Sequence, residues 1–258
     1  MTHHIPASPG PRVADREVLL RVRGVRAAAG GAAERPVLDD VNFDLRRGER
    51  LGVLGETARA LPLLARVLTG RPAPGDRFLA GSALFAAGPV QAGERGCVTP
   101  YDPAAAPGPH PGPRVLVADL TALSDEEGLA RTDRLRAEAP ALDADGTALI
   151  VLGGRFETLA ALCDTLQVVA GGRIVERGPA AELRARPRHR LTEALRAGST
   201  APPDGTGTGR GCFFEPHCPR GRGQDRCRHE IPGPTPYASP HGAVTVKCHL
   251  PAPVAAKP

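Results

Sequence analysis

The stretch GVLGETARALPLLARVLTG, residues 52–70, constrains the fold more than any other part of the chain. An apolar run ends at Gly55, and a pattern with helical period begins near Ala60 and stops at Gly70. A buried strand, a short loop and a helix in this order are typical of α/β proteins, in which strands and helices alternate. We therefore expect an α/β domain that starts before this junction and continues beyond it.

The rest of the chain continues the alternation. Strands are expected at 17–27, at 37–55 with a turn at 46–49, at 114–120, at 147–154, and as a hairpin at 166–178. Helices are expected at 125–139, at 156–165 and at both ends of 179–198. The apolar runs that end in polar residues suit buried parallel strands, and the hairpin adds an antiparallel portion. The fold class is therefore α/β with a mostly parallel sheet.

Composition limits the kinds of core and partner that the chain can have. Glycine (31) and proline (28) make up nearly a quarter of the 258 residues, while aromatic residues are 3% and tryptophan is absent, so we expect an aliphatic core and long loops. The formal charge of +5 is spread along the chain without interleaved aromatic residues, and a solvated basic surface is expected instead of a nucleic-acid partner. No run approaches the roughly 18 apolar residues of a membrane span, and residues 1–12 lack the apolar centre of a secretory signal. We expect a cytoplasmic protein.

The junction has the position of a phosphate-binding loop but not its chemistry. The pattern G-x-x-x-x-G-K-[ST] binds nucleotide because glycine admits close backbone contact with phosphate, lysine neutralises charge and the hydroxyl holds magnesium. Here the second glycine, the lysine and the hydroxyl residue are replaced by Ala60, Leu61 and Pro62. The candidate nucleotide site consists of Gly55, Glu56, Thr57, Ala58, Arg59, Ala60, Leu61 and Pro62.

Three stretches together resemble the ATP-binding subunit of the oligopeptide/dipeptide (peptide/nickel) ABC importers. They are VLDDVNFDLRRGERLGVLGE at 37–56, VVAGGRIVERGPAAEL at 168–183, and GCFFEPHCPRGRGQDRCRHEIP at 211–232 followed by VKCHLP at 246–251. The resemblance implies an ABC-type P-loop nucleotide-binding core with a small Cys-rich C-terminal extension. It also implies a second ATPase subunit and permease subunits as partners, with contact to the inner face of the plasma membrane only through them.

The resemblance assigns further positions, and each departs from the family pattern. RVLVADL aligns with the Walker B strand, which places Asp119 at the magnesium-linked acid and Leu120 at the catalytic glutamate. Tyr101 stands where the Q-loop glutamine is expected, and Gly154 stands at the switch histidine. Only residues 104–113 occupy the place of the helical subdomain that carries the signature sequence. With no lysine, glutamate or histidine to act on phosphate and water, we expect no ATP hydrolysis, and ATP and Mg²⁺ binding is in doubt.

Four of the six cysteines follow residue 210, at spacings C-x5-C-x8-C-x20-C: Cys212, Cys218, Cys227 and Cys248. In a reducing cytosol, four thiolates are suited to an iron-sulfur cluster or to zinc, and the sequence alone does not separate the two. The resemblance implies a four-iron (4Fe-4S) cluster bound by all four, with zinc and free structural cysteines as the alternatives. We expect the extension to be a surface appendage far from the cassette core, and the Arg-rich segment 184–190 to be a solvated helix face.

The predicted organisation is a disordered tail at 1–16, a degenerate cassette domain at 17–198, a linker at 199–210, the Cys-rich extension at 211–251 and a tail at 252–258. Three functional hypotheses remain open from the sequence. The chain is an inactive partner subunit of a peptide-type importer, or a scaffold or regulatory module whose working part is the four-cysteine site, or a decaying paralogue without a role. A working ATPase is disfavoured.

Overall fold

The computed structural model describes residues 13–30, 36–55, 59–85, 88–89, 97–103, 114–199 and 210–253. Two sheets and six α-helices account for most of these residues. Most of the predicted N-terminal tail, the segment 104–113 and most of the predicted linker lie outside the described residues. Among the described residues, no helix combines the length and apolar character that crossing a bilayer requires.

The larger sheet has eight strands in the order β11-β12-β10-β9-β3-β8-β7-β6. Its strands are β3 (Arg50–Gly55), β6 (Val98–Pro100), β7 (Val115–Asp119), β8 (Ala148–Leu152), β9 (Thr165–Ala170), β10 (Arg173–Pro179), β11 (Thr235–Tyr237) and β12 (Val244–Val246). The five strands from β9 to β6 pair in parallel, and β10, β12 and β11 pair antiparallel at one edge. This arrangement confirms the predicted fold class.

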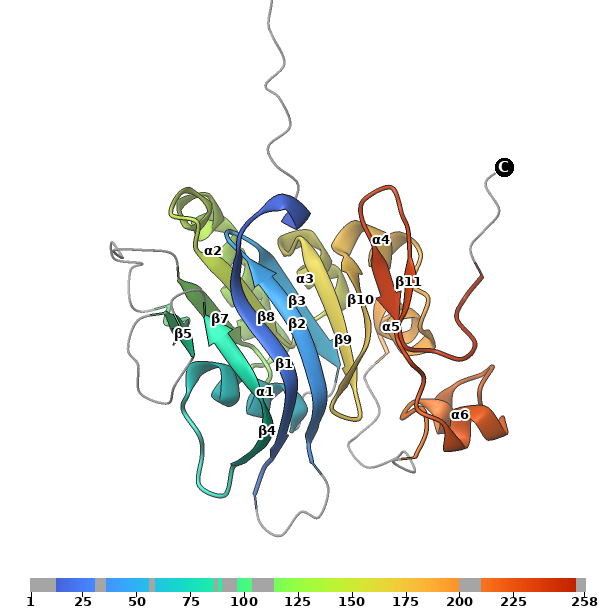
Figure 1. Ribbon diagram of the computed structural model, residues 1–258. Coiled ribbons are helices and arrows are strands. Elements are labelled where there is room, and N and C mark those ends of the chain that lie inside the picture. The colour runs from blue at the N-terminus through green and yellow to red at the C-terminus, as the bar shows by residue number, and fades with distance from the viewer. Residues whose placement is uncertain are drawn as a thin grey trace, which may run out of the picture.

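The smaller sheet has four antiparallel strands in the order β2-β1-β4-β5. They are β1 (Val18–Ala28), β2 (Leu38–Arg46), β4 (Arg77–Phe85) and β5 (Gly88–Pro89). The predicted turn between β2 and β3 is present, with Gly48 at a positive φ of 64°, and it carries the chain from one sheet to the other. In Figure 1 the smaller sheet lies in front of the larger one.

Two aliphatic cores cover the two faces of the larger sheet. Because successive strand residues point to opposite faces, Leu51 and Val53 of β3 pack toward the smaller sheet, while Leu54 packs on the other side. The first core lies between the two sheets and includes α1 (Ala60–Thr69). The second core lies under α2 (Asp125–Ala144), α3 (Phe156–Leu162), α4 (Ala180–Ala185) and α5 (Arg190–Arg196).

The helix boundaries follow local signals in the sequence. Helix α1 ends at Gly70, whose left-handed conformation (φ 63°) is typical of a helix stop, and α2 begins with a capping box between Ser124 and Glu127. Helix α2 is longer than predicted because it continues through Pro140 to Ala144. Burial of Leu142 in the second core offsets the backbone hydrogen bond that proline removes.

The Cys-rich extension is part of the cassette sheet and not a distant appendage, so that expectation was wrong. Its strand β12 pairs with β10 in antiparallel register, with Glu176 opposite Val246, and the short helix α6 (Asp225–His229) lies in the same extension. The backbone N–H of Lys247 donates to Val175 O at 2.7 Å, and Ala252 N–H donates to Arg188 O at 2.9 Å. In Figure 1 the C-terminal strands, coloured red, lie beside the hairpin of β9 and β10.

Candidate functional site

The first residue of the candidate nucleotide loop must be glycine. Gly55 ends β3 with φ 135°, a conformation that other residues rarely adopt, and a Cβ there would collide with the carbonyl oxygen of Val169 on β9. Glu56, Thr57 and Ala58 lie outside the described residues. Glycine at this position is therefore required by the close approach of β9.

The positions that should contact phosphate belong instead to helix α1 and the core. Ala60 and Leu61 are fully buried, at 0% exposure, and Leu61 packs among the apolar side chains between the two sheets. Pro62 lies in the first turn of α1, where the missing N–H costs no helical hydrogen bond. Arg59 precedes the helix without a side-chain cap, and its guanidinium donates to Ala29 O at 3.1 Å. No cationic group takes the place of the lysine among the described residues of the loop.

The carboxylate of Asp119, at the end of β7, accepts hydrogen bonds from Thr121, two residues further along the chain. Its Oδ1 accepts from the backbone N–H of Thr121 at 3.0 Å and from the Thr121 hydroxyl at 2.6 Å. This local turn is the strand-end arrangement that short acidic side chains commonly form. Leu120, the next residue, is 4% exposed and packs into the second core. The position aligned with the catalytic glutamate therefore contributes to packing.

Gly154 lies close to Leu120 at the same end of the parallel strands. It has φ 92°, and a Cβ built on it would stand 3.1 Å from Leu159 Cδ1 and 3.5 Å from Leu120 Cδ1. A histidine at this position would be strained by the backbone and crowded by these leucines. The structure thus brings together the residues that the resemblance places at the catalytic and switch positions, and the surface between them is apolar.

Tyr101 follows β6 and is fixed against α2. It is 9% exposed, its hydroxyl donates to Glu138 Oε2 at 2.9 Å, and the guanidinium of Arg131 lies 5.8 Å from the ring centre. Burial, followed by the adjacent Glu138 carboxylate, raises the pKa of Tyr101 to about 12. A side chain held in this way positions α2 instead of extending toward a nucleotide.

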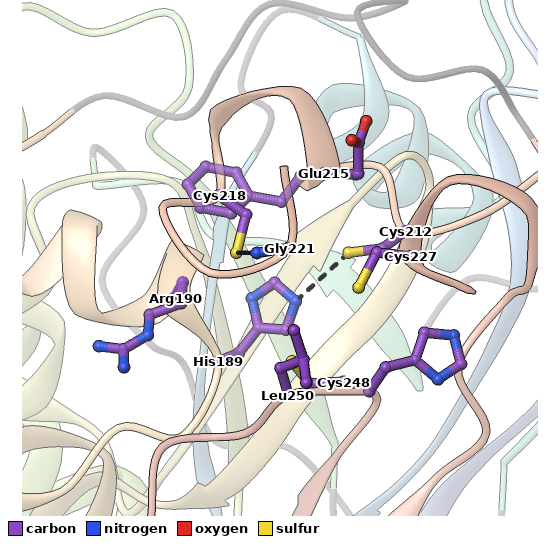
Figure 2. Close-up of a pocket in the computed structure, with 11 residues that line it drawn as sticks. His189, Arg190, Cys212, Glu215, Cys218, Gly221, Cys227, Cys248 and Leu250 are labelled. Carbon is purple, nitrogen blue, oxygen red and sulfur yellow. Dashed lines mark hydrogen bonds between the residues drawn. The ribbon is translucent and has the colours of Figure 1, made fainter. Parts of the chain in front are cut away.

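The four C-terminal cysteines line one small cavity, together with His189, Arg190, Phe214 and Glu215. Its volume is about 10 Å³, which is room for about one water molecule. Cys218 and Cys227 are buried, while Cys212 and Cys248 are partly buried. The sequence therefore identified a set of residues that the fold gathers from α6, from the loop before it and from the segment after β12 (Figure 2).

Protein groups bond three of the four sulfurs. The backbone N–H of Phe214 donates to Cys212 Sγ, and that of Leu250 donates to Cys248 Sγ. The N–H of Gly221 donates to Cys218 Sγ at 3.2 Å, and Nε2 of His189 lies 3.9 Å from Cys212 Sγ. Burial raises the pKa of Cys212 to about 12 and also raises the pKa values of Cys227 and Cys248.

The cavity fits a metal centre in donor chemistry but not in arrangement. Four thiols suit an iron-sulfur cluster or zinc, and metals bind them as thiolates. However, in the part of the chain that the structure describes, no three His, Cys, Asp or Glu side chains are grouped to hold a metal ion.

His189 is a residue of this site that the sequence patterns did not reveal. The segment 184–190 was expected to be solvated, but Arg188 is 7% exposed and His189 is 1% exposed, so that expectation was wrong for both. Arg188 stacks over Tyr237 of β11, with 4.3 Å from its guanidinium carbon to the ring centre. The sequence signal was weak, because an N-cap position before an apolar helix indicates a helix start but not a contact with Cys212, 23 positions away.

Comparisons with known proteins agree with the fold. No protein-family model matches the sequence. A probable peptide ABC transporter ATP-binding protein from Sinorhizobium fredii is 35% identical over 126 residues, covering 43% of this chain and 34% of that protein. The lipoprotein-releasing system ATP-binding protein LolD from Chromohalobacter salexigens is 33% identical over 86 residues, covering 32% of this chain and 36% of LolD. The chain thus spans about a third of the length of these relatives.

A solved ATP-binding cassette of an ABC transporter in its ADP conformation has the same fold. It superposes with a TM-score of 0.51 at 14% identity, covering 71% of this chain and all of that chain. The fold is therefore that of an ABC ATPase cassette. The two sequence relatives support a relationship with the ATP-binding domains of ABC transporters.

Proposed function

We propose that this chain, an ABC ATPase cassette by its fold and by its partial sequence similarity, is a subunit of a peptide-type ABC importer that does not hydrolyse ATP. The observation that carries the proposal is the placement of Leu61. The residue aligned with the phosphate-binding lysine is an apolar side chain at 0% exposure in the core, followed by Pro62 in place of the magnesium-binding hydroxyl.

The remaining catalytic positions support the same conclusion. ATP hydrolysis needs positive charge at the β- and γ-phosphates, a held magnesium ion and a polar group that orients water. Leu120 and Gly154 provide no group that could orient water. Asp119 retains a carboxylate, but Thr121 already occupies one of its oxygens with two hydrogen bonds.

Weak nucleotide binding by the backbone is still compatible with the fold. The loop that follows β3 is the one that resembles a phosphate-binding loop, and Gly55 at its start keeps a positive φ of 135°. The first backbone N–H groups of α1 lack a side-chain cap, so the helix terminus keeps its favourable electrostatics for an anion. Without lysine and magnesium ligands, we expect affinity only in the millimolar range.

The peptide-type assignment is supported by the resemblance of the C-terminal stretch and by the peptide transporter relative from Sinorhizobium fredii. In this role the chain would lie on the cytoplasmic face of the membrane through permease subunits and would pair with a competent ATPase subunit. Its contribution would be structural, because it offers neither the lysine of a phosphate loop nor catalytic carboxylate and imidazole groups at the aligned positions.

The first experiment is a titration of the purified chain with a fluorescent ATP analogue and Mg²⁺, beside a competent ABC ATPase as control. We expect no saturation below millimolar analogue and no phosphate release above background. Micromolar binding would contradict the proposed loss of the phosphate site, and turnover comparable to the control would overturn the proposal.

The second experiment tests the partners. A tagged copy at native expression level is purified with membranes, and co-purifying proteins are identified by mass spectrometry. The proposal expects permease and ATPase subunits of one importer in stoichiometric amounts. Recovery of neither kind of subunit would count against a transporter role.

The alternative candidate is a module whose working part is the cysteine cavity. It is favoured by one observation, the presence of all four C-terminal cysteines on one cavity. Cys212, Cys218, Cys227 and Cys248 would hold a four-iron cluster, with zinc as the other possibility, only after their sulfurs move from the arrangement described above, in which no three such side chains are grouped to hold a metal ion. Iron, sulfide and zinc analysis of anaerobically purified protein tests this, and protein with none of the three would exclude it.

A further inference from the structure

We propose that His189 is a positioning residue of the cysteine cavity, which holds the Cys212 sulfur on the cavity wall and thereby joins the Cys-rich extension to the cassette. The inference rests on geometry and does not depend on whether the cavity takes up a metal. In Figure 2 the imidazole of His189 points toward Cys212, along the contact of 3.9 Å between Nε2 and Sγ.

The backbone of His189 is held by the cassette sheet. Glu176, on β10, is fully buried and accepts the N–H groups of Arg188 at 2.8 Å and His189 at 3.0 Å. Two backbone hydrogen bonds to one buried carboxyl group fix this turn. His189 therefore enters the cavity from a rigid part of the fold.

The ring of His189 is oriented by the helix that follows. The imidazole caps α5, since its Nδ1 accepts the backbone N–H of Leu191 at 3.1 Å. A neutral imidazole that accepts at Nδ1 carries its proton on Nε2. The Nε2–H group therefore donates toward Cys212. As long as Nδ1 caps α5, Nε2 carries the proton and cannot bind a metal ion.

The contact joins the two parts of the chain at the point where they meet. Phe214 packs beside the imidazole, with ring centres 6.1 Å apart, so the loop that carries Cys212 contacts His189 at two places. Cys248 also lines the cavity and follows β12, which pairs with β10 with Val246 opposite Glu176. The same strand thus supports His189 and the chain segment of Cys248.

Two substitutions separate the two bonds of the imidazole. In His189→Asn the amide oxygen replaces Nδ1 as the cap of α5, a favourable residue for this position, but no donor reaches Cys212. In His189→Gln the amide nitrogen can replace Nε2 near Cys212, but the cap is lost. A role limited to capping predicts a stronger effect of His189→Gln, whereas the positioning role predicts a stronger effect of His189→Asn at Cys212.

The measurement is the rate at which each cysteine of the full chain reacts with N-ethylmaleimide at one pH under native conditions, followed by peptide mass spectrometry. Cys212 is partly buried, so it reacts mainly after its side chain leaves the cavity wall, and a weaker contact in the closed arrangement makes this opening more frequent. We therefore expect His189→Asn to raise the rate at Cys212 roughly two- to tenfold over wild type, the factor that corresponds to loss of one hydrogen bond, and His189→Gln to raise it less. Equal rates in wild type and His189→Asn, or a larger increase in His189→Gln, would overturn the proposal.

Controls distinguish this result from loss of folding or of metal. His229→Asn changes an exposed histidine of the same extension and is expected to leave the Cys212 rate unchanged. Hydrogen exchange of residues 190–196 reports the cap of α5, and it should be faster in His189→Gln but not in His189→Asn. Metal content is measured on every sample, so that failure of the metal-site candidate is distinguished from failure of this inference.

Discussion

Restoring the missing lysine is expected to damage the protein without restoring activity. In Leu61→Lys an ammonium group would enter a position with 0% exposure between the two sheets, where Leu61 packs among aliphatic side chains. Loss of a buried leucine costs about 2–5 kcal/mol, and burial of the charge adds to this unless the ammonium reaches solvent. We therefore expect at least about 2 kcal/mol of destabilisation, a large part of the roughly 5–15 kcal/mol that is usual for a domain.

Urea unfolding followed by circular dichroism gives the free energy of unfolding for Leu61→Lys, wild type and the control Leu61→Met. The control keeps the apolar volume, and it should cost less than about 1.5 kcal/mol. Phosphate release from Mg-ATP is measured on the same samples and should stay at background, because Leu120 and Gly154 still provide no group to orient water.

Two outcomes would refute this reasoning. If Leu61→Lys is as stable as Leu61→Met, position 61 faces solvent or the loop and not the core. If Leu61→Lys hydrolyses ATP, the alignment of the catalytic positions is wrong.

Three further predictions test the packing around the site. Gly55→Ala should lower the urea midpoint far more than the control Gly24→Ala. Both positions have a positive φ, which costs an alanine about 1–2 kcal/mol, but a Cβ at Gly24 would meet no atom within 4 Å. Equal shifts in the two variants would contradict the close contact at Gly55. Asp76→Asn should cost about 1–3 kcal/mol at pH 7 by breaking two bonds with Arg66, at 2.6 and 3.0 Å. The hydrogen bond from Arg66 holds the pKa of Asp76 below 3.8. The difference in free energy of unfolding between wild type and Asp76→Asn should therefore be present above about pH 4 and shrink as the pH falls through the lowered pKa of Asp76. A difference that stays constant from about pH 7 to 2 would contradict this role of Asp76. Tyr101→Phe should cost about 0.5–1.5 kcal/mol and leave nucleotide affinity unchanged, and a change in that affinity would indicate a Q-loop role.

Sequence patterns predicted the main elements of the cassette because their signals are local, but they did not predict β11, β12 or α6 of the extension. Glycines at positive φ marked the end of α1 at Gly70 and the turn of the β9–β10 hairpin at Gly171 and Gly172. The apolar runs that became β7 and β8 are buried on both faces, as parallel central strands are. The end of α2 was missed because burial of Leu142 decided it, and burial is a property of the packed sheet.

For the candidate nucleotide site, too, some features could be predicted from residue types and others required the structure. The absence of lysine, glutamate and histidine at the aligned positions could be seen directly in the residue types. That Leu61 is core, that Asp119 is bonded by Thr121 and that Leu120 lies beside Gly154 required coordinates. Each of these statements depends on the direction of a side chain, which spacing alone does not fix.

The cysteine cavity shows most clearly which features could not be predicted from the sequence. The sequence shows four thiols and their spacings, and these indicated one site near the C-terminus. The tertiary structure alone decided that β12 joins the cassette sheet at β10, that the cavity has room for about one water molecule, and that His189 faces Cys212 inside it. The physical reason is that residue types and local periodicity determine which chemistry and which elements are available. The pairing of strands distant in the chain determines which side chains meet, and that pairing depends on the burial of the whole sheet.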